Sequence, residues 1–296
     1  MISFSWPNGK RVAVLVSVLL ETWADGKNPS YFPRTTALKP GTPDLPAKQW
    51  SDYGAEEGVW RILAILEKCG VPATVFSSAI AAELYPDLIK QILNLGHHIA
   101  AHGYSQDQFL LDFTVDEQQA TIRRCLDILT KATGRRPTGW GTPVYGGTKE
   151  TPELLVREGV KWSADAANTS LPRLHHTPSG TIIALPWSDF VDNRVLRGNP
   201  RDFHDVYRDT FDYLYAYEPL SILQIGFHGH FGGRPLMSAQ LHKVLQYLKS
   251  FPDVWFTRHE DIVAWFVSQN IEMVSPQQRF FGHGDLINSA GRKSAP

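Results

Sequence analysis

Short apolar runs rich in valine and isoleucine alternate with longer amphipathic runs along almost the whole chain, and this alternation constrains the fold most. The run from Arg11 to Leu20 is almost wholly apolar, as is typical of a strand buried on both faces of a parallel sheet. The next amphipathic run, Gly58 to Lys68, is followed by Gly70, and a glycine there is a helix stop signal. Repeated alternation of this kind predicts a parallel sheet covered by helices.

The same patterns give the expected elements. The expected strands are 11–20, 71–76, 97–102, 137–142, 160–164, 181–187, 221–228 and 254–256, and the expected helices are 58–68, 86–95, 114–133, 152–158, 200–217, 239–250 and 261–268. Seven or eight strands without a glycine-rich phosphate loop favour an α/β barrel. No linker divides the chain, so residues 1–275 are expected to form one barrel domain.

Two segments interrupt the alternation. The stretch from Glu21 to Asp52 holds five prolines, so it is expected to be irregular. Loops this long are often functional, and this one is expected to cover a pocket or to pack on a neighbouring subunit. Residues 276–296 are polar, and we expect an irregular tail there that packs on a neighbouring surface or subunit.

Composition excludes several function classes. A formal net charge of −1 gives no sign of a nucleic-acid partner. No signal peptide is visible, and the longest apolar run is too short to span a bilayer, so we expect a cytoplasmic protein without a membrane partner. Cys69 and Cys125 lack metal-binding spacing and are expected to be reduced packing residues. The aromatic content of 11% and the tail fit a homo-oligomer.

Polar and titratable residues gather where the expected strands end, which is where parallel barrels place their active sites. They are Glu21 and Asp25 after the first strand, His102, Tyr104 and Gln106 after the third, Thr142 and Tyr145 after the fourth, Asp165 after the fifth, and His228 and His230 after the seventh, with Trp140 inside the fourth. A single histidine at a strand end is more often structural than catalytic. The coincidence of several strand ends predicts an active site.

Five segments carry a more specific signal. They are Tyr53 to Arg61, Gly70 to Phe76, Gly96 to Tyr104, Gly134 to Trp140 and Phe227 to Pro235. In these segments the chain resembles the polysaccharide-deacetylase, or NodB-like, family, and most of all the branch that contains metal-independent allantoinases and cyclic imide hydrolases. The resemblance extends over about residues 10–265. It implies a distorted (β/α) barrel of seven or eight strands and a hydrolase of C–N bonds other than peptide bonds.

The family's deacetylases hold a metal with an aspartate from an Asp-Asp pair and two histidines from a His-x-x-x-His motif. This chain has Leu19-Leu20-Glu21 at the first motif, and at the second it keeps His102 but has Gln106 in place of the second histidine. Glutamine is a weak ligand for zinc-like ions. We therefore expect no cofactor, although Glu21 or Asp25 could rebuild a metal site with His102.

Loss of the metal favours a particular substrate chemistry. A metal supplies hydroxide and polarises the carbonyl, and a plain N-acetyl amide needs both. The nitrogen of a cyclic imide or ureide carries a second acyl group and leaves as a stabilised amide anion. A general base and hydrogen-bond donors could then suffice. The sequence therefore predicts metal-independent opening of a small cyclic imide or ureide.

The roles follow from these positions. Glu21 is the candidate general base or water-positioning group, His102 orients water or polarises the carbonyl, and the resemblance implies that His228 is the general acid or oxyanion donor; which residue is base and which is acid stays open. The candidate substrate-binding residues are Asp25, Tyr104, Gln106, Trp140, Tyr145, His230 and Arg234. Arg34 is a further candidate for recognising a carboxylate. With bulky aromatic groups around the site, we expect a closed pocket for one planar ring and little more.

Two other functions remain open. One is a metal-dependent carbohydrate N-deacetylase with a rebuilt metal site. The other is a catalytically inactive barrel that binds a sugar or a ring compound. Assays of ring substrates with and without a chelator would separate these alternatives.

Overall fold

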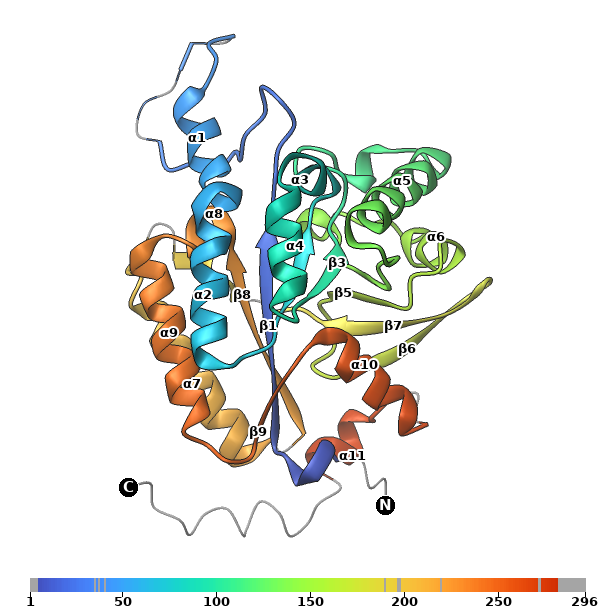
Figure 1. Ribbon diagram of the computed structural model, residues 1–296. Helices are drawn as coiled ribbons and strands as arrows, with labels where there is room; N and C mark the ends of the chain where they lie inside the picture. Colours follow the sequence, from blue (N-terminus) through green and yellow to red (C-terminus); the bar gives the residue numbers. More distant parts are fainter. Residues whose placement is uncertain are drawn as a thin grey trace.

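A single curved sheet surrounded by helices makes up the computed structural model, which describes residues 5–281 except 35, 37, 40, 189, 196, 197, 219, 271 and 272 (Figure 1). Its strands are β1 (Val12–Leu20), β2 (Thr74–Ser77), β3 (His98–Ala101), β4 (Gly139–Trp140), β5 (Trp162–Ala166), β6 (Arg173–Thr177), β7 (Gly180–Pro186), β8 (Ser221–His228) and β9 (Val254–Thr257). Its helices are α1 (Leu45–Tyr53), α2 (Val59–Cys69), α3 (Ala79–Leu84), α4 (Pro86–Asn94), α5 (Val115–Thr133), α6 (Thr151–Arg157), α7 (Asp202–Tyr217), α8 (Gly229–Gly232), α9 (Pro235–Lys249), α10 (His259–Ser268) and α11 (Pro276–Phe281).

The strand order is β6-β7-β5-β4-β3-β2-β1-β8, with β9 also paired to β1. Every pair is parallel except β6 with β7. Between β7 and β8 the described residues form no strand ladder, only a single parallel bridge between Val191 and Gly226. The sheet is therefore an incomplete barrel with a seam at this bridge.

Strand β1 lies at the centre of the sheet and its residues alternate between two apolar layers. Val12, Val14, Val16 and Val18 face the layer beneath the outer helices. Ala13 and Leu15 face the barrel interior, where they pack with Phe76, Trp162 and Phe266. Because side chains alternate along a strand, the interior face continues through Leu19 to Glu21, and both residues line the cavity described below.

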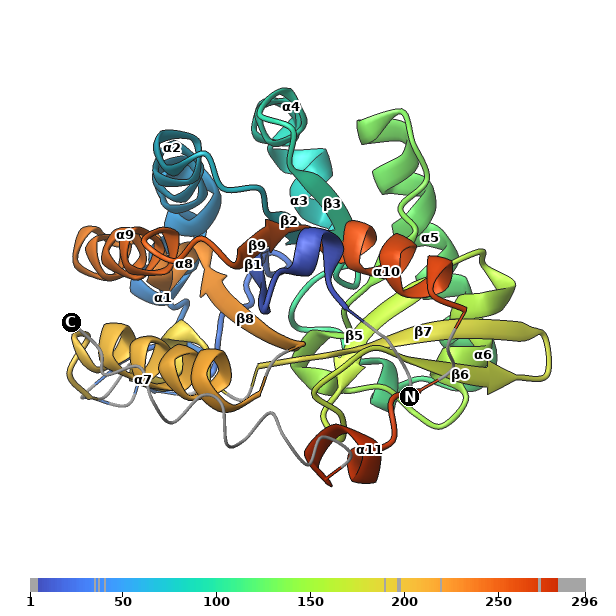
Figure 2. The same cartoon turned by 90° about the horizontal axis from the view of Figure 1, so that it is seen from below.

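Helices cover the outer face of the sheet, and a view from below shows α7, α9, α2, α4 and α5 arranged around the strands (Figure 2). Helix α5 has the capping box expected from its sequence, with Thr114 and Glu117 capping each other's backbone. Helix α10 begins at His259, directly after β9, and packs Ile262 and Phe266 into the barrel interior. None of the described helices is long and apolar enough to cross a membrane.

The expected α/β barrel is confirmed, with differences in detail. The polar segment before the strand expected at 181–187 contains β6, none of whose residues is fully buried, so it lacks the apolar pattern of a core strand. Part of the proline-rich stretch, expected to be irregular, forms α1. Asp44 caps that helix by accepting a hydrogen bond from the Ala47 amide at 3.2 Å, and Pro46 sits in its first turn, where a missing N–H costs nothing.

The short helices α3 and α8 also lay outside the expected elements. The expected irregular tail starts with helix α11. Its Arg279 pairs with Glu218 at 2.8 Å, so this helix packs against the body of the same chain. The rest of the tail, residues 282–296, lies outside the described residues. Cys69 and Cys125 are both buried and free.

Candidate active site

The register of the sheet brings three strand ends to one level. Leu20 pairs with Ser77, and Ser77 pairs with Ala101, so the residues that follow β1 and β3 emerge side by side. On the other edge of β1, Leu19 pairs with His228. Glu21, His102 and His228 therefore meet, although more than 200 residues separate the first from the last.

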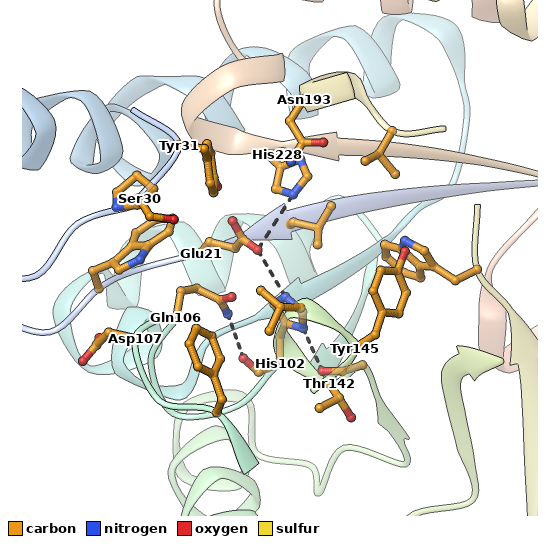
Figure 3. A pocket seen from close by; sticks show the side chains of 18 of the residues that line it. Glu21, Ser30, Tyr31, His102, Gln106, Asp107, Thr142, Tyr145, Asn193 and His228 are labelled. Atoms are coloured by element: carbon orange, nitrogen blue, oxygen red, sulfur yellow. Dashed lines mark hydrogen bonds and ion pairs between the residues drawn. The ribbon is translucent and has the colours of Figure 1, made fainter. Parts of the chain in front are cut away.

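A buried carboxylate surrounded by three imidazoles forms the centre of the site, and Figure 3 shows two of them, His102 and His228, on either side of Glu21. Glu21 Oε1 lies 3.3 Å from His102 Nε2 and 3.9 Å from His228 Nε2, and Glu21 Oε2 lies 3.8 Å from His230 Nδ1. All four side chains are at least nine-tenths buried. Burial alone would raise the pKa of Glu21, but the positive charge of His228 is the largest of the effects that oppose burial, and this pKa is lowered to about 2. Glu21 is therefore ionised.

A second carboxylate, Asp192, binds His228 on the side of the ring opposite to Glu21. Its Oδ1 lies 2.5 Å from His228 Nδ1, and its Oδ2 accepts the His228 backbone N–H at 2.8 Å. Burial would lower the pKa of His228, but the charges of Asp192 and Glu21 more than compensate and raise it to about 9. His228 is thus cationic at neutral pH and directs its Nε2–H toward Glu21.

His230 is the neutral member of the group. Complete burial lowers its pKa to about 3. Its Nε2 lies 2.8 Å from the hydroxyl of Tyr31, whose own pKa is raised by burial, so that Tyr31 remains a hydrogen-bond donor. If Tyr31 donates to Nε2, the ring proton sits on Nδ1 and faces Glu21 Oε2. This contact also ties the proline-rich stretch to the site, where Trp50 of α1 packs on the same ring at 4.9 Å.

Hydrogen bonds fix the orientation of His102. Its Nδ1 donates to the carbonyl oxygen of Gly141 at 2.7 Å. A carbonyl can only accept, so Nδ1 carries a proton and Nε2 is the nitrogen that faces Glu21. The next residue, Thr142, donates its backbone N–H and its hydroxyl to the two oxygens of Asp165, each at 2.8 Å.

A cavity of about 650 Å³ opens above this group. Its polar and charged lining includes Glu21, Asn28, Ser30, Tyr31, His102, Gln106, Asp107, Thr142, Asp165, Asn193, Arg194 and His228, and its larger apolar walls are Trp23, Phe109, Tyr145 and Trp187. Residues 28–31 show that the proline-rich stretch covers part of the cavity, as predicted. The volume lies within the range of pockets for drug-sized ligands. The cavity is therefore larger than the expected closed pocket for one planar ring and little more.

The wall that carries Tyr145 has an unusual backbone. Val144 and Tyr145 both have positive φ values, 51° and 56°, a conformation that L residues rarely adopt and that is least favourable for a β-branched residue. Both residues line the cavity, where Tyr145 meets Trp187 edge to face at 6.0 Å. Strain of this kind is often kept at functional sites.

Five of the predicted substrate-binding residues do not line this cavity. Asp25 is exposed in a turn. Tyr104 stacks under the guanidinium of Arg124 at 3.9 Å. Trp140 is fully buried in the outer core, because the side chain of a β4 residue at its position faces the helices; Trp187 and Trp23 form the aromatic walls instead.

Arg234 lies over the ring of Tyr53 at 3.6 Å and donates to the carbonyls of His230 and Trp50, so it joins α8 to α1. His230 is shielded from the cavity but contacts Glu21. Arg34, the carboxylate-recognition candidate, pairs with Asp44.

Gln106 does line the cavity, with its amide nitrogen bound to Ser78 Oγ at 3.1 Å and to the His102 carbonyl at 3.2 Å. Sequence reasoning missed Asp192, Asn193, Arg194 and Trp187. All of them follow or end the strand expected at 181–187, so their signal in the sequence is the same as for the other site residues: polar or aromatic groups at the C-terminal end of a strand.

The donor set does not fit the metal triad of the family's deacetylases. Gln106 uses its amide as a donor, and Leu20, at the position of the aspartate pair, is buried in the outer core. Among the described residues, no group of three or more histidine, cysteine, aspartate or glutamate side chains has metal-binding geometry. We derive no catalytic step through a metal.

Known proteins resemble the chain in sequence and fold. Residues 49–161 match the family model for polysaccharide deacetylase. The crystal structure of PuuE allantoinase superposes with a TM-score of 0.82 at 29% identity, covering 89% of this chain and 92% of that one. A probable polysaccharide deacetylase from Pseudomonas aeruginosa PAO1 gives 0.81 at 29% identity, covering 89% and 93%. A peptidoglycan deacetylase from Helicobacter pylori is 21% identical over 74% of this chain and 86% of its own length.

Proposed function

The chain carries a polysaccharide-deacetylase domain of the NodB-like type, a family of C–N hydrolases, and from this premise we propose that it opens a small cyclic imide or ureide ring without a metal. The observation that carries the proposal is the Glu21 carboxylate held between His102, His228 and His230 at the floor of the cavity. The similarity to PuuE allantoinase, over most of both chains, supports a ring substrate.

His102 is the better candidate for the base. A carboxylate with a pKa of about 2 accepts protons poorly at neutral pH, so Glu21 is assigned to positioning the water and balancing positive charge. His102 Nε2 is the nitrogen that faces both Glu21 and the cavity. A water bound at Glu21 would give its proton to this nitrogen as it attacks the ring carbonyl.

His228 is the candidate acid. Its cationic ring places an N–H at the cavity, on the other side of Glu21 from His102 (Figure 3). There it stabilises the oxyanion that forms on the carbonyl oxygen, or protonates the departing ring nitrogen. Base and acid would thus stand on either side of a water bound at Glu21.

Ring chemistry explains why these groups suffice. Attack of water breaks the bond between the ring carbonyl carbon and the ring nitrogen, and yields a carboxylic acid and an amide on one opened chain. The leaving nitrogen keeps a second acyl group that spreads its negative charge. A plain N-acetyl group lacks this help, so its hydrolysis would rely on metal polarisation of the carbonyl.

The test is a panel of substrates assayed with and without a strong chelator. We expect hydrolysis of succinimide- or hydantoin-type rings that survives the chelator, and no acetate release from N-acetylglucosamine oligomers. The variant Glu21→Gln is the matched control for contaminating activity and should lose turnover.

Two outcomes would reject the proposal. Acetate release from the oligomers that is lost on chelation and restored by zinc would assign the protein to the metal-dependent deacetylases, a function that the match to the polysaccharide-deacetylase model favours. Ring binding without any turnover, seen as thermal stabilisation by the ring compounds, would identify an inactive binding barrel.

A further inference from the structure

One peptide group lies between a carboxylate and the histidine assigned as base. The carbonyl oxygen of Gly141 accepts from His102 Nδ1 at 2.7 Å, and the amide N–H of Thr142 donates to Asp165 Oδ1 at 2.8 Å. Both atoms belong to the same planar unit, and in a trans peptide they point in opposite directions. Asp165 and His102 therefore lie on opposite edges of a single peptide.

We propose that Asp165 is a positioning residue that acts on His102 through the peptide joining Gly141 and Thr142. The negative carboxylate at the N–H end aligns with the peptide dipole of about 3.5 D and makes the carbonyl oxygen a stronger acceptor, because hydrogen bonds in a chain polarise one another. The stronger acceptor holds the proton on Nδ1. Nε2 then stays directed at Glu21 and at the cavity.

Further contacts hold this arrangement in one orientation. The indole N–H of Trp140 donates to Thr142 Oγ1 at 3.0 Å. An indole nitrogen can only donate, so the hydroxyl uses a lone pair there and has its own proton free for Asp165 Oδ2 at 2.8 Å. Trp140, which does not line the cavity, thus supports the site from the core side.

Neighbouring groups fix the position of the peptide and leave no room for a side chain at Gly141. The Gly141 amide donates to the Ala101 carbonyl at 2.9 Å, which ties it to the end of β3. A Cβ on Gly141 would come within 2.8 Å of the ring of Phe76, and this ring packs edge to face on His102 at 6.2 Å. Glycine is needed here for this close approach rather than for its backbone freedom.

The surrounding charges are consistent with this role. Glu21, which follows β1, contacts His102 on the cavity side, and Asp165 from β5 binds the far edge of the peptide. Burial raises the pKa of Asp165, and the two hydrogen bonds from Thr142 favour its charged form. Asp165 also lines the cavity, but both of its oxygens are engaged by Thr142, so it is not the group that receives the proton of the water.

The first test is spectroscopic and needs no substrate. The inference rests on the proposed function only for the catalytic use of Nε2, so a tautomer measurement can fail or succeed separately from it. In the ¹⁵N NMR spectrum of the intact protein, His102 should be protonated on Nδ1, with its Nδ1–H proton far downfield. Protonation on Nε2 alone would overturn the proposal whatever the activity is.

The second test compares two variants. Asp165→Asn removes the charge with little change in shape, and Thr142→Val removes the hydroxyl but keeps the peptide N–H. In Asp165→Asn the Nδ1–H resonance should move upfield, and kcat on an accepted ring should fall about 10- to 100-fold with KM within about twofold. A directly bonded carboxylate behind a histidine contributes up to ~10⁴ in kcat in serine proteases, and the intervening peptide weakens the effect.

Thr142→Val should keep the wild-type resonance and lose less than about fivefold in kcat. Equal losses and equal resonance shifts in the two variants would mean that the hydroxyl contact, not the carboxylate acting through the peptide, matters, and would overturn the proposal. So would a wild-type resonance in Asp165→Asn. If Asp165→Asn does not fold, Asp165→Ser replaces it as the variant without the charge, with the same expected upfield shift and loss in kcat, and a wild-type resonance there would equally overturn the proposal.

Discussion

The pairing of His228 with Asp192 gives the sharpest prediction, because it ties activity to pH. The two carboxylates raise the pKa of His228 from an ordinary 6.5 to about 9, and at ~1.4 kcal/mol for each pH unit this stabilises the cation by about 3 kcal/mol. In Asp192→Asn the main stabilising charge is lost while burial remains, so the pKa of His228 should fall to 6.5 or below.

The assay is kcat/KM on an accepted ring substrate from pH 6 to pH 10. Wild-type activity should decline as the pH rises through about 9, since the cationic form of His228 is required. In Asp192→Asn the decline should occur below about pH 7, so the variant should be about 30-fold less active than wild type at pH 8 and within a few-fold of it at pH 6. Asp116→Asn, which removes one exposed charge from the first turn of α5, is the control and should keep the wild-type profile.

Stability gives an independent reading of the same pair. A histidine whose pKa is raised on folding contributes stability that is complete below its unfolded pKa of 6.5 and is lost as the pH rises through about 9. The difference in Tm between wild type and Asp192→Asn should therefore be largest near pH 6 and should shrink by pH 10. A difference in activity and in Tm that is the same at every pH would refute the reasoning, because Asp192 would then be a structural residue only.

Three further variants test other parts of the site. His102→Ala should lower kcat/KM by ~10²-fold or more while circular dichroism stays native, and wild-type kinetics in this folded variant would remove His102 from the mechanism; His176→Ala, exposed on β6, is its control. Tyr31→Phe removes the hydrogen bond to His230 and should lower kcat/KM about fivefold. The control Tyr213→Phe changes an exposed tyrosine of α7 and should leave kcat/KM unchanged. Equal changes of kcat/KM in the two variants would contradict the contact between Tyr31 and His230. Arg194 lines the cavity and forms no ion pair with any described residue. Arg194→Gln should therefore reduce kcat/KM about 10-fold more for a ring that bears a carboxylate than for an uncharged ring. An unchanged ratio of kcat/KM between the two substrates would show that this guanidinium does not contact the substrate.

The central strands could be predicted from sequence because their pattern is a direct consequence of burial. Strand β1 is covered on both faces, and so are most residues of β8, so their sequences are nearly continuous apolar runs. Strand β6 has one antiparallel neighbour and no fully buried residue, so no apolar run marks it. Helix α1 depends on a cap from Asp44 and on a proline placed in its first turn, and counting prolines alone could not distinguish such a helix from a loop.

The site was predictable only where a strand ends. Glu21, His102 and His228 directly follow or end strands, and the register of β1 with β8 on one edge and with β2 and β3 on the other makes them neighbours. The direction in which a side chain points was harder to predict. Trp140 was expected at the cavity, but β4 is only two residues long, too short for alternation in the sequence to show which face it presents.

The position of Asp192, which raises the pKa of His228, depends on the seam in the sheet. Between β7 and β8 a single bridge, Val191 to Gly226, replaces a ladder, and a Cβ on Gly226 would lie 2.5 Å from the side chain of Val191. The next residue, Asp192, reaches the backbone N–H and the ring of His228, two residues beyond Gly226. A complete ladder would have engaged that backbone N–H with another strand. The incomplete closure of the barrel therefore leaves room for a carboxylate at the edge of β8, and this carboxylate is what keeps the imidazole beside Glu21 charged.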